Sequence, residues 1–390
     1  MDAYIIKGYR TAVTRAKKGG FKNTRPDDMA VDTIKYLVNS IEGLEPGMID
    51  DLIVGNAVQE AEQGMQMGRM ISLMALGIDN PGMVINRYCG SGLEAIHLAA
   101  AKISAGMGDL IIAGGTESMS MVPIMGFKTA LNYGIASETP SYYTSMGMTA
   151  EQISKQFKIS REDQDEFAYN SHMRAIAAQD KGLFKDDIVP INIKETFVNE
   201  EMKRTTREFT IETDEGPRRD TSIEALAKLR PVFAQGGSVT AGNSSPTNDG
   251  AAFVLVASEK AIKQLNLKPT AQLLSYAVAG VDPQIMGIGP VKAIPKALDK
   301  AGLKLDDIDL FELNEAFASQ ALAVVRELGM DYEKTNVNGG AIALGHPLGS
   351  TCARLSITLL SEMERRNSKY GIVSACVGGG QGVAGVYERL

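Results

Sequence analysis

A repeated strand–turn–helix pattern constrains the fold of this chain more than any other sequence feature. Asp51-Leu-Ile-Val-Gly-Asn56 in the first third matches Asp309-Leu-Phe-Glu-Leu-Asn314 in the last third, with Asp, Leu and Asn in register. Each segment is followed by a helix pattern, a glycine-containing turn, a second helix pattern and an apolar strand that ends in glycines. Strands that alternate with helices predict a mostly parallel sheet with helices on its faces. The repeat therefore predicts an α/β fold built from two copies of one unit.

Apolar periodicity gives the expected bounds of the individual elements. In the first copy we expect strands at Ala3–Gly8, Asp51–Asn56, Met83–Ile85 and Asp109–Gly115, and helices at Asp27–Asn39, Met65–Leu76 and from Leu93 onward. In the second copy we expect strands at Thr270–Val278, Asp309–Asn314, Asn336–Asn338 and, as the last strand, Gly371–Cys376, with helices at Val291–Ala301, Ala316–Leu328 and Ser350–Arg365.

The stretch from Ser118 to Thr247 fits neither copy and reads as an insertion between them. We expect helices at Thr149–Phe157 and Asp163–Gln179, the second begun by a capping box at Ser160, and then a charged hairpin within Ile191–Arg219. Turn-rich sequence leads from the insertion into an apolar strand at Ala251–Ala257. Long insertions into such scaffolds commonly cover or shape a functional site.

Composition and charge exclude several classes of protein. A net charge of −7 disfavours nucleic acid as a general partner. Three widely spaced cysteines with no CxxC pair indicate free thiols in a reducing compartment, not a disulfide framework or a structural zinc site. No apolar stretch reaches the length of a membrane span, and the first residues lack the apolar region of a signal peptide. We therefore expect a cytoplasmic enzyme that does not insert into membranes.

Cys89 stands on the turn from a strand into a helix, between Tyr88 and Gly90 and close to Gly92. Free N–H groups and the macrodipole at a helix N-terminus favour an anion, so this position is expected to lower the pKa of the thiol. Taken alone, Cys89 fits a reactive thiol and a buried structural cysteine about equally well.

Of the three histidines, His346 is the candidate for chemistry because it lies between Gly345 and Pro347 at an expected helix start. His97 lies on an apolar helix stripe and reads as a core or interface residue. His172 lies in a polar helix of the insertion and is expected to be solvated.

Four residues together form a chemically complete set. Cys89 would be the nucleophile and His346 the base that deprotonates it. Cys376, at a strand end before three glycines, is a second thiol that could move protons. Asn314 could supply a polar donor or hold a water, and backbone N–H groups near Cys89 and Gly378 could form an oxyanion hole. If the halves are related by a pseudo-twofold axis, Cys89 and His346 lie on equivalent turns and could meet at the seam.

Seven motifs give the chain a specific resemblance. They are Asn86-Arg-Tyr-Cys-Gly-Ser-Gly92, Gly114-Gly-Thr-Glu-Ser-Met119, Thr240-Ala-Gly-Asn243 with Asn248-Asp-Gly250, Asn314-Glu-Ala-Phe317, Asn338-Gly-Gly-Ala341, Gly345-His-Pro347 and Cys376-Val-Gly-Gly-Gly380. In this order and spacing, over essentially the full length, the chain resembles a thiolase. The resemblance implies two βαβαβαββ halves in a five-layer αβαβα arrangement with an inserted loop domain. It places the N-terminal half at 1–117 and 248–268, the loop domain at 118–247 and the C-terminal half at 269–390.

The resemblance also implies a mechanism in which coenzyme A is a co-substrate and no cofactor or metal is bound. Cys89 attacks the 3-keto carbon of a 3-oxoacyl-CoA, and Cys376 protonates the departing acetyl-CoA enolate. A second coenzyme A, deprotonated by Cys376, then takes the acyl group from Cys89. His346 activates Cys89 and, with a water on Asn314, forms one oxyanion hole; the N–H groups of Cys89 and Gly378 form the other.

The same resemblance assigns substrate contacts and an assembly. The residues implied in substrate binding are Arg218 at the nucleotide end of coenzyme A, Ser245 at the pantetheine, and Met146, Met286, Ala316 and Phe317. The family implies a homodimer or a homotetramer.

Two positions depart from the family's pattern. Cys352 stands where the family usually has glycine shortly after Gly-His-Pro, which puts a bulkier side chain near His346. Ser145 stands where the acetoacetyl-CoA-specific branch typically has histidine, which would leave room for a longer acyl tail. The chain thus looks more like the degradative branch of β-oxidation, a 3-ketoacyl-CoA thiolase. An acetoacetyl-CoA thiolase that condenses two acetyl-CoA molecules is the alternative.

Three other interpretations fit less well. A β-ketoacyl synthase would normally carry a second histidine where Asn314 stands. A non-catalytic acyl-CoA-binding scaffold predicts the loss of Cys89, His346 or Cys376, yet all three are present. A zinc site would require ligand pairs close in sequence, which are missing. The basic residues Lys203, Arg204, Arg207, Arg218 and Arg219 read as a solvated hairpin, with Arg218 alone favoured as a phosphate contact.

Overall fold

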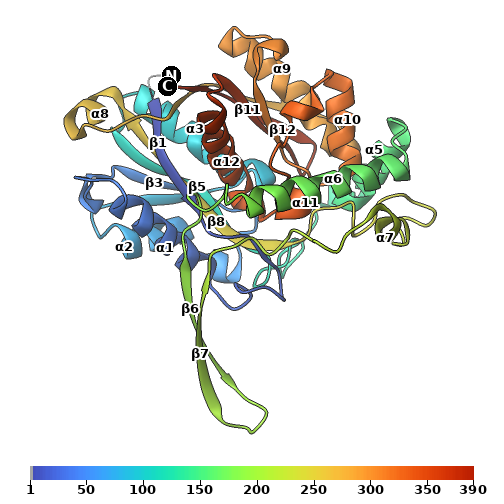
Figure 1. Ribbon diagram of the computed structural model, residues 1–390, viewed down its shortest axis with the longest axis horizontal. Coiled ribbons are helices and arrows are strands. Elements are labelled where there is room, and N and C mark those ends of the chain that lie inside the picture. Colours follow the sequence, from blue (N-terminus) through green and yellow to red (C-terminus); the bar gives the residue numbers. More distant parts are fainter. Residues whose placement is uncertain (1–2) are drawn as a thin grey trace.

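A computed structural model describes residues 3–390, whose strands form one ten-stranded mixed sheet and a separate two-stranded hairpin (Figure 1). The order in the large sheet is β10-β11-β12-β9-β1-β8-β5-β3-β4, with β2 attached to β8. The strands are β1 (Ala3–Arg10), β2 (Thr14–Arg15), β3 (Asp51–Gly55), β4 (Gly82–Ile85), β5 (Leu110–Ser118), β6 (Ile191–Val198), β7 (Arg204–Ile211), β8 (Asn248–Ser258), β9 (Ala271–Gly280), β10 (Leu310–Leu313), β11 (Tyr370–Val377) and β12 (Gln381–Arg389).

The helices lie between these strands and in the insertion. They are α1 (Pro26–Asn39), α2 (Met67–Ala75), α3 (Ser91–Ser104), α4 (Tyr133–Glu138), α5 (Met146–Gln156), α6 (Arg161–Asp180), α7 (Ile223–Ala227), α8 (Glu259–Leu265), α9 (Gly289–Ala301), α10 (Ala318–Leu328), α11 (Ala341–Leu344) and α12 (Thr351–Arg366). Two short 3₁₀ helices matter for the site: η3 (Tyr88–Gly90) precedes α3, and η8 (Leu348–Ser350) precedes α12. In residues 3–390, no helix is both long and apolar enough to cross a bilayer.

The sheet confirms the predicted duplication. In the first half, β3 pairs parallel with β5, and β5, β8 and β1 then pair antiparallel in turn. In the second half, β10 pairs parallel with β11, and β11, β12 and β9 repeat the antiparallel series. The halves join where β1 pairs antiparallel with β9, at Tyr4–Gln272 and Ile5–Ala271.

Three hydrophobic cores separate five layers. The first core lies between the first half of the sheet and the outer helices α1 and α2. The central core combines the apolar faces of α3 and α12 with residues of both halves of the sheet. The third lies between the second half of the sheet and the outer helices α9 and α10. The central pair α3 and α12 thus fills the space between the two halves, which agrees with the expected αβαβα arrangement.

Most predicted elements are present within a few residues of their expected bounds, but two expectations about the second copy are wrong. Asn336–Asn338 is a turn and not a strand: Asn336 has φ +47°, and its amide donates to the Leu313 carbonyl at 2.8 Å. Gly371–Cys376 is not the last strand, because β12 follows it and occupies an interior place in the sheet.

The insertion contains the predicted helices and hairpin. Helix α6 begins with the expected capping box, in which the Ser160 hydroxyl accepts the Asp163 N–H at 3.0 Å. The hairpin β6–β7 pairs along its whole length and projects away from the body of the molecule (Figure 1).

Candidate active site

Cys89 is the middle residue of η3, immediately before the first turn of α3. The preceding residue, Tyr88, has φ +42°, a left-handed conformation that is unusual for a residue with a bulky side chain. The side chain of Cys89 is half-buried and packs against Ala57, Met119 and Leu348. The sequence prediction of a strand–turn–helix position for Cys89 is therefore confirmed.

The expectation that the helix start lowers the pKa of Cys89 is wrong for this structure. Burial raises the pKa of Cys89 to about 12, although hydrogen bonds from the N–H groups of Gly378 and of Cys89 itself act in the opposite direction. Removing the thiolate from water costs more than these two backbone donors return. Cys89 rests as a neutral thiol and requires a base to become a nucleophile.

His346 is held from three sides in a buried loop before η8. Its backbone N–H donates to Oδ1 of Asn248 at 2.9 Å. Its Nδ1 lies 2.6 Å from Oγ1 of Thr351, and its Nε2 lies 3.3 Å from Nδ2 of Asn314. Gly345 has φ +100°, and a Cβ there would lie 2.6 Å from the Asn248 side chain, so only glycine permits this close approach.

The imidazole of His346 is neutral at physiological pH. Burial, assisted by the Arg354 guanidinium, lowers the pKa of His346 to about 3. A neutral imidazole keeps one nitrogen lone pair, so His346 can accept a proton.

Asn314 follows β10, and its backbone N–H donates to the Ser374 carbonyl of β11 at 2.9 Å. Its side chain is fully buried, and Oδ1 has no hydrogen-bond partner among the described residues. A buried acceptor without a partner is costly, so this oxygen fits a water or a ligand donor.

Cys376 is fully buried near the end of β11, two residues before Gly378. Burial raises the pKa of Cys376 well above its ordinary value, and the nearby Cys89 raises it further. Four of the predicted substrate residues form one apolar cluster with Cys376: Met146, Met286, Ala316 and Phe317. A Cβ built on Gly378 would lie 3.7 Å from the Met146 sulfur, so this cluster reaches the Gly378 amide.

The two turns come together as expected, but their functional residues are not at equivalent positions. Because η3 matches η8, Cys89 corresponds to Gly349, and His346 corresponds to Asn86. The first turns of the central helices α3 and α12 lie against each other: a Cβ on Gly92 would lie 2.6 Å from the backbone nitrogen of Ala353.

Cys352, at the position that corresponds to Gly92, resolves the packing question raised by the sequence. Its side chain is fully buried in the central core. Its thiol donates to the backbone carbonyl of Cys89 at 3.1 Å. The bulkier residue is therefore accommodated in the central core, and its thiol links helix α12 to the backbone of Cys89.

Two residues are predicted to contact coenzyme A. Arg218 lies at the surface of the insertion, and Ser245 lies near the apolar cluster. Ser245 is half-buried, and its N–H donates to the Ala316 carbonyl at 3.0 Å. Arg218 is exposed, and within residues 3–390 no ion pair joins its guanidinium. By contrast, Lys203, Arg207 and Arg219 pair with Glu201, Glu195 and Asp180.

The other two histidines differ in how well they were predicted. His172 is buried and not solvated, which contradicts the sequence expectation: its Nδ1 accepts the Arg218 N–H at 3.2 Å. His97 is half-buried on α3 and stacks on Tyr276 at a centroid distance of 4.3 Å.

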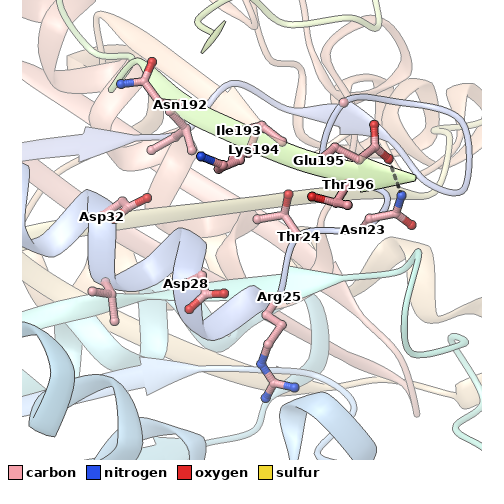
Figure 2. A pocket seen from close by; sticks show the side chains of 13 residues that line it. Asn23, Thr24, Arg25, Asp28, Asp32, Asn192, Ile193, Lys194, Glu195 and Thr196 are labelled. Carbon is pink, nitrogen blue, oxygen red and sulfur yellow. Dashed lines mark hydrogen bonds between the residues drawn. The ribbon is translucent and has the colours of Figure 1, made fainter. Parts of the chain in front are cut away.

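A cavity of about 650 Å³ lies elsewhere, between β6 and the start of α1 (Figure 2). Polar side chains such as Asp28, Asp32 and Lys194 line it, and Asn23 bonds Glu195 at its rim. None of the predicted catalytic or substrate residues lines this cavity. In the described part of the chain, no group of three or more His, Cys, Asp or Glu side chains is arranged to hold a metal ion.

Three residues that shape the site were not singled out from sequence. Asn248 and Glu117 lie inside quoted motifs, and Thr351 lies five residues after His346. Glu117 accepts the N–H groups of Ala57 at 2.8 Å and Gly349 at 2.9 Å. It thus ties the turn after β3 to the turn before α12. The spacing of Thr351 from His346 was a usable signal, since a hydroxyl in the first turn of a helix reaches back along the preceding loop.

Comparisons with known proteins agree with this arrangement. Residues 3–260 match the family model "Thiolase, N-terminal domain", and residues 267–389 match "Thiolase, C-terminal domain". A 3-ketoacyl-CoA thiolase of Bacillus subtilis is 52% identical over 99% of both chains. An acetyl-CoA acetyltransferase of Pseudomonas aeruginosa is 45% identical over 98% of both. The peroxisomal 3-ketoacyl-CoA thiolase A of mouse is 44% identical over 99% of this chain and 91% of its own. The crystal structure of the Bacillus anthracis acetyl-CoA acetyltransferase superposes with a TM-score of 0.90 at 41% identity, covering 100% of this chain and 99% of that one.

Proposed function

The chain belongs to the thiolase family, and from this premise we propose that it is a 3-ketoacyl-CoA thiolase: an acyltransferase that cleaves 3-oxoacyl-CoA with coenzyme A. The observation that carries the proposal is that the turn with Cys89 and the turn with His346 come together. The Gly378 N–H reaches the Cys89 sulfur, while Asn314 holds Nε2 of His346. A nucleophile, a neutral base and a second thiol therefore share one buried region.

In the first half-reaction, His346 accepts the Cys89 proton at Nε2, and the thiolate attacks the 3-keto carbon of the substrate. The N–H groups of Cys89 and Gly378 stabilise the alkoxide that forms. When the bond between C2 and C3 breaks, the acyl group stays on Cys89. The acetyl-CoA enolate leaves and takes a proton from Cys376, while Asn314 with a water and His346 stabilises its oxygen.

In the second half-reaction, Cys376 accepts the thiol proton of an incoming coenzyme A. The resulting thiolate attacks the acyl-Cys89 thioester, and Cys89 departs as the leaving thiolate. This thiolate then takes back its proton from Nε2 of His346, which restores the neutral thiol and the neutral imidazole. Both cysteine pKa values are raised by burial. A raised pKa makes each thiolate a strong base that takes up a proton readily, and this suits Cys376 to accept the proton of coenzyme A.

Two observations favour the degradative branch over an acetoacetyl-CoA thiolase. Ser145, which is exposed, directly precedes Met146, and Met146 packs against the Cys376 cluster, so a small residue stands next to this apolar cluster. The B. subtilis relative is named a 3-ketoacyl-CoA thiolase. We accordingly assign the chain to fatty acid β-oxidation. The alternative, condensation of two acetyl-CoA, has support from the relatives named acetyl-CoA acetyltransferase.

The test is coenzyme A-dependent cleavage of purified 3-oxoacyl-CoA substrates from four to sixteen carbons. We expect turnover to extend well beyond the four-carbon substrate, and Ser145→His to shift the preference toward it. Ser141→His, in the same segment before α5, is the matched control. A strict preference of the unmodified protein for acetoacetyl-CoA would assign it to the condensing branch.

We also propose that Arg218 binds the phosphates of coenzyme A, because its guanidinium is exposed and has no ion pair among residues 3–390. Arg218→Ala should raise the KM for coenzyme A, whereas Arg219→Ala, which removes a side chain already paired with Asp180, should not. An unchanged KM in Arg218→Ala would remove this residue from the binding site.

We propose an N-terminal half of residues 1–117 and 248–268, a coenzyme A-binding loop domain of residues 118–247 and a C-terminal half of residues 269–390. We further propose a cytoplasmic homodimer or homotetramer with free thiols. Sedimentation equilibrium of the purified protein measures the assembly, and a monomer at micromolar concentration would contradict it.

A further inference from the structure

Thr351, the first residue of α12, touches the imidazole of His346 and has no part in the scheme above. Its Oγ1 lies 2.6 Å from Nδ1 of His346 and donates to the backbone carbonyl of Pro347 at 2.8 Å. Thr351 is fully buried and His346 is 5% exposed, so solvent does not compete for these contacts.

The direction of the hydrogen bond to His346 follows from counting hydrogens. A hydroxyl carries one hydrogen, and a threonine in a first helical turn commonly gives it to the carbonyl four residues earlier. Because that hydrogen is on the Pro347 carbonyl, Oγ1 offers only lone pairs to His346. In this arrangement the contact at 2.6 Å is made by a hydrogen on Nδ1 that is donated to Oγ1.

The opposite edge of the ring agrees with this assignment. A neutral imidazole carries one hydrogen, so with Nδ1 protonated Nε2 has a lone pair. Nδ2 of Asn314, which can only donate, lies 3.3 Å from Nε2. With the Asn314 amide in this orientation, its Nδ2 is compatible with the tautomer that the Thr351 contact favours.

We infer that Thr351 is a positioning residue that holds His346 as the Nδ1–H tautomer and leaves the Nε2 lone pair as the base. When the Cys89 S–H bond breaks, its proton forms the Nε2–H bond, and the resulting imidazolium keeps its Nδ1–H donated to Thr351. The identity of the transferred proton rests on the proposed function, whereas the tautomer does not.

Ser350 provides a matched control. Its hydroxyl donates to the same Pro347 carbonyl, at 3.1 Å, and it is equally buried. No hydrogen bond joins its side chain to His346 in the part of the chain that the structure describes. Ser350→Ala therefore removes a comparable hydroxyl without touching the imidazole.

The experiment combines ¹⁵N-histidine NMR with kinetics. The chain has only three histidines, and the His346→Asn spectrum assigns the His346 signals. We expect the unmodified protein and Thr351→Ser to show a protonated Nδ1 and a bare Nε2, and Thr351→Val to populate the Nε2–H form. The kcat of Thr351→Val should fall about ten- to a hundredfold, as for other groups that orient a functional histidine. Its KM for coenzyme A should stay unchanged, and Ser350→Ala should match the unmodified protein.

A protonated Nε2 in the unmodified protein overturns the inference without any variant. A Thr351→Val protein with unchanged kcat and tautomer also overturns it, as does a loss in Ser350→Ala equal to that in Thr351→Val. If the unmodified protein cleaves no 3-oxoacyl-CoA, the proposed function fails, yet the NMR measurement still decides the tautomer.

Discussion

In the first half of the sheet, Asn56 directly follows β3 and Glu117 lies near the end of β5. At the equivalent places, after β10 and near the end of β11, the second half has Asn314 and Cys376. The register gives this equivalence, since Gly55 pairs with Gly115 as Leu313 pairs with Ser374. Asn56 and Glu117 bond each other at 3.2 Å. In the second half the amide instead bonds a histidine, and a thiol replaces the carboxylate.

The turns before the central helices differ in the same way. The first half has Asn86, Cys89 and Ser91 where the second has His346, Gly349 and Thr351. Ser91 accepts the Arg87 N–H and donates to the Tyr88 carbonyl, so its hydroxyl serves only its own turn. Thr351 instead contacts the ring of His346. One scaffold therefore carries the proposed nucleophile in one half and the groups that we propose to handle protons in the other. Substitutions at three pairs of equivalent positions test this division.

The largest effect is expected at the position shared by Cys89 and Gly349. Cys89→Ala should lower turnover by at least about 10⁴-fold, because the nucleophile is lost, while stability changes by about 1 kcal/mol or less. Gly349→Ala should instead prevent stable folding, because its Cβ would lie 2.7 Å from the Asn56 Cα and the Gly55 carbonyl oxygen. Mass spectrometry of the acyl-enzyme and thermal unfolding measure the two outcomes. Acylated protein in Cys89→Ala would show that another residue is the nucleophile.

At the position shared by Glu117 and Cys376, we expect substitution in the second half to lower kcat and substitution in the first half to lower the free energy of unfolding. Cys376→Ala should lower kcat by about 10²- to 10⁴-fold, the usual contribution of an acid–base group. Glu117→Gln should lower the free energy of unfolding by about 2–3 kcal/mol, because a buried amide N–H would face N–H donors that now bond the carboxylate. These donors belong to Asn56, Ala57, Gln63 and Gly349. Urea denaturation and steady-state kinetics on both variants measure the difference. If Glu117→Gln is as stable as the unmodified protein, the carboxylate does not hold the turns together.

A pH-dependent effect is expected at the position shared by Asn86 and His346. The pKa of His346 is lowered by burial to about 3, so between the ordinary histidine value and that pH the unfolded chain binds a proton that the folded chain does not. The contribution of His346 to stability is therefore lost as the pH falls through this window. His346→Asn introduces the residue that stands at this position in the first half and does not titrate. The free energy of unfolding of this variant should therefore fall less steeply as the pH decreases, by up to about 1.4 kcal/mol per pH unit. Urea unfolding of both proteins from pH 7 to pH 4 measures the difference. Parallel curves would mean that His346 titrates equally in both states.

Sequence reasoning found the elements with strong periodicity and missed those set by long-range contacts. The duplication, the strand before Cys89 and the capping box of α6 were readable because spacing and local chemistry determine them. The strand predicted at Asn336–Asn338 was wrong because hydrogen bonds to Leu313, which is distant in sequence, hold Asn336 in a turn. His172 was misjudged because the residue that covers it, Arg218, is distant in sequence.

The sequence by itself determined the family, the duplicated α/β fold and the residue types of the site, because glycines, thiols and a histidine at fixed spacing restrict the chemistry. Only the tertiary structure decided their states. Burial, which depends on both halves packing around α3 and α12, keeps Cys89 a thiol and His346 neutral. The contact with Thr351 then orients the imidazole. A pKa and a tautomer depend on the groups that surround a side chain, and only folding brings those groups together.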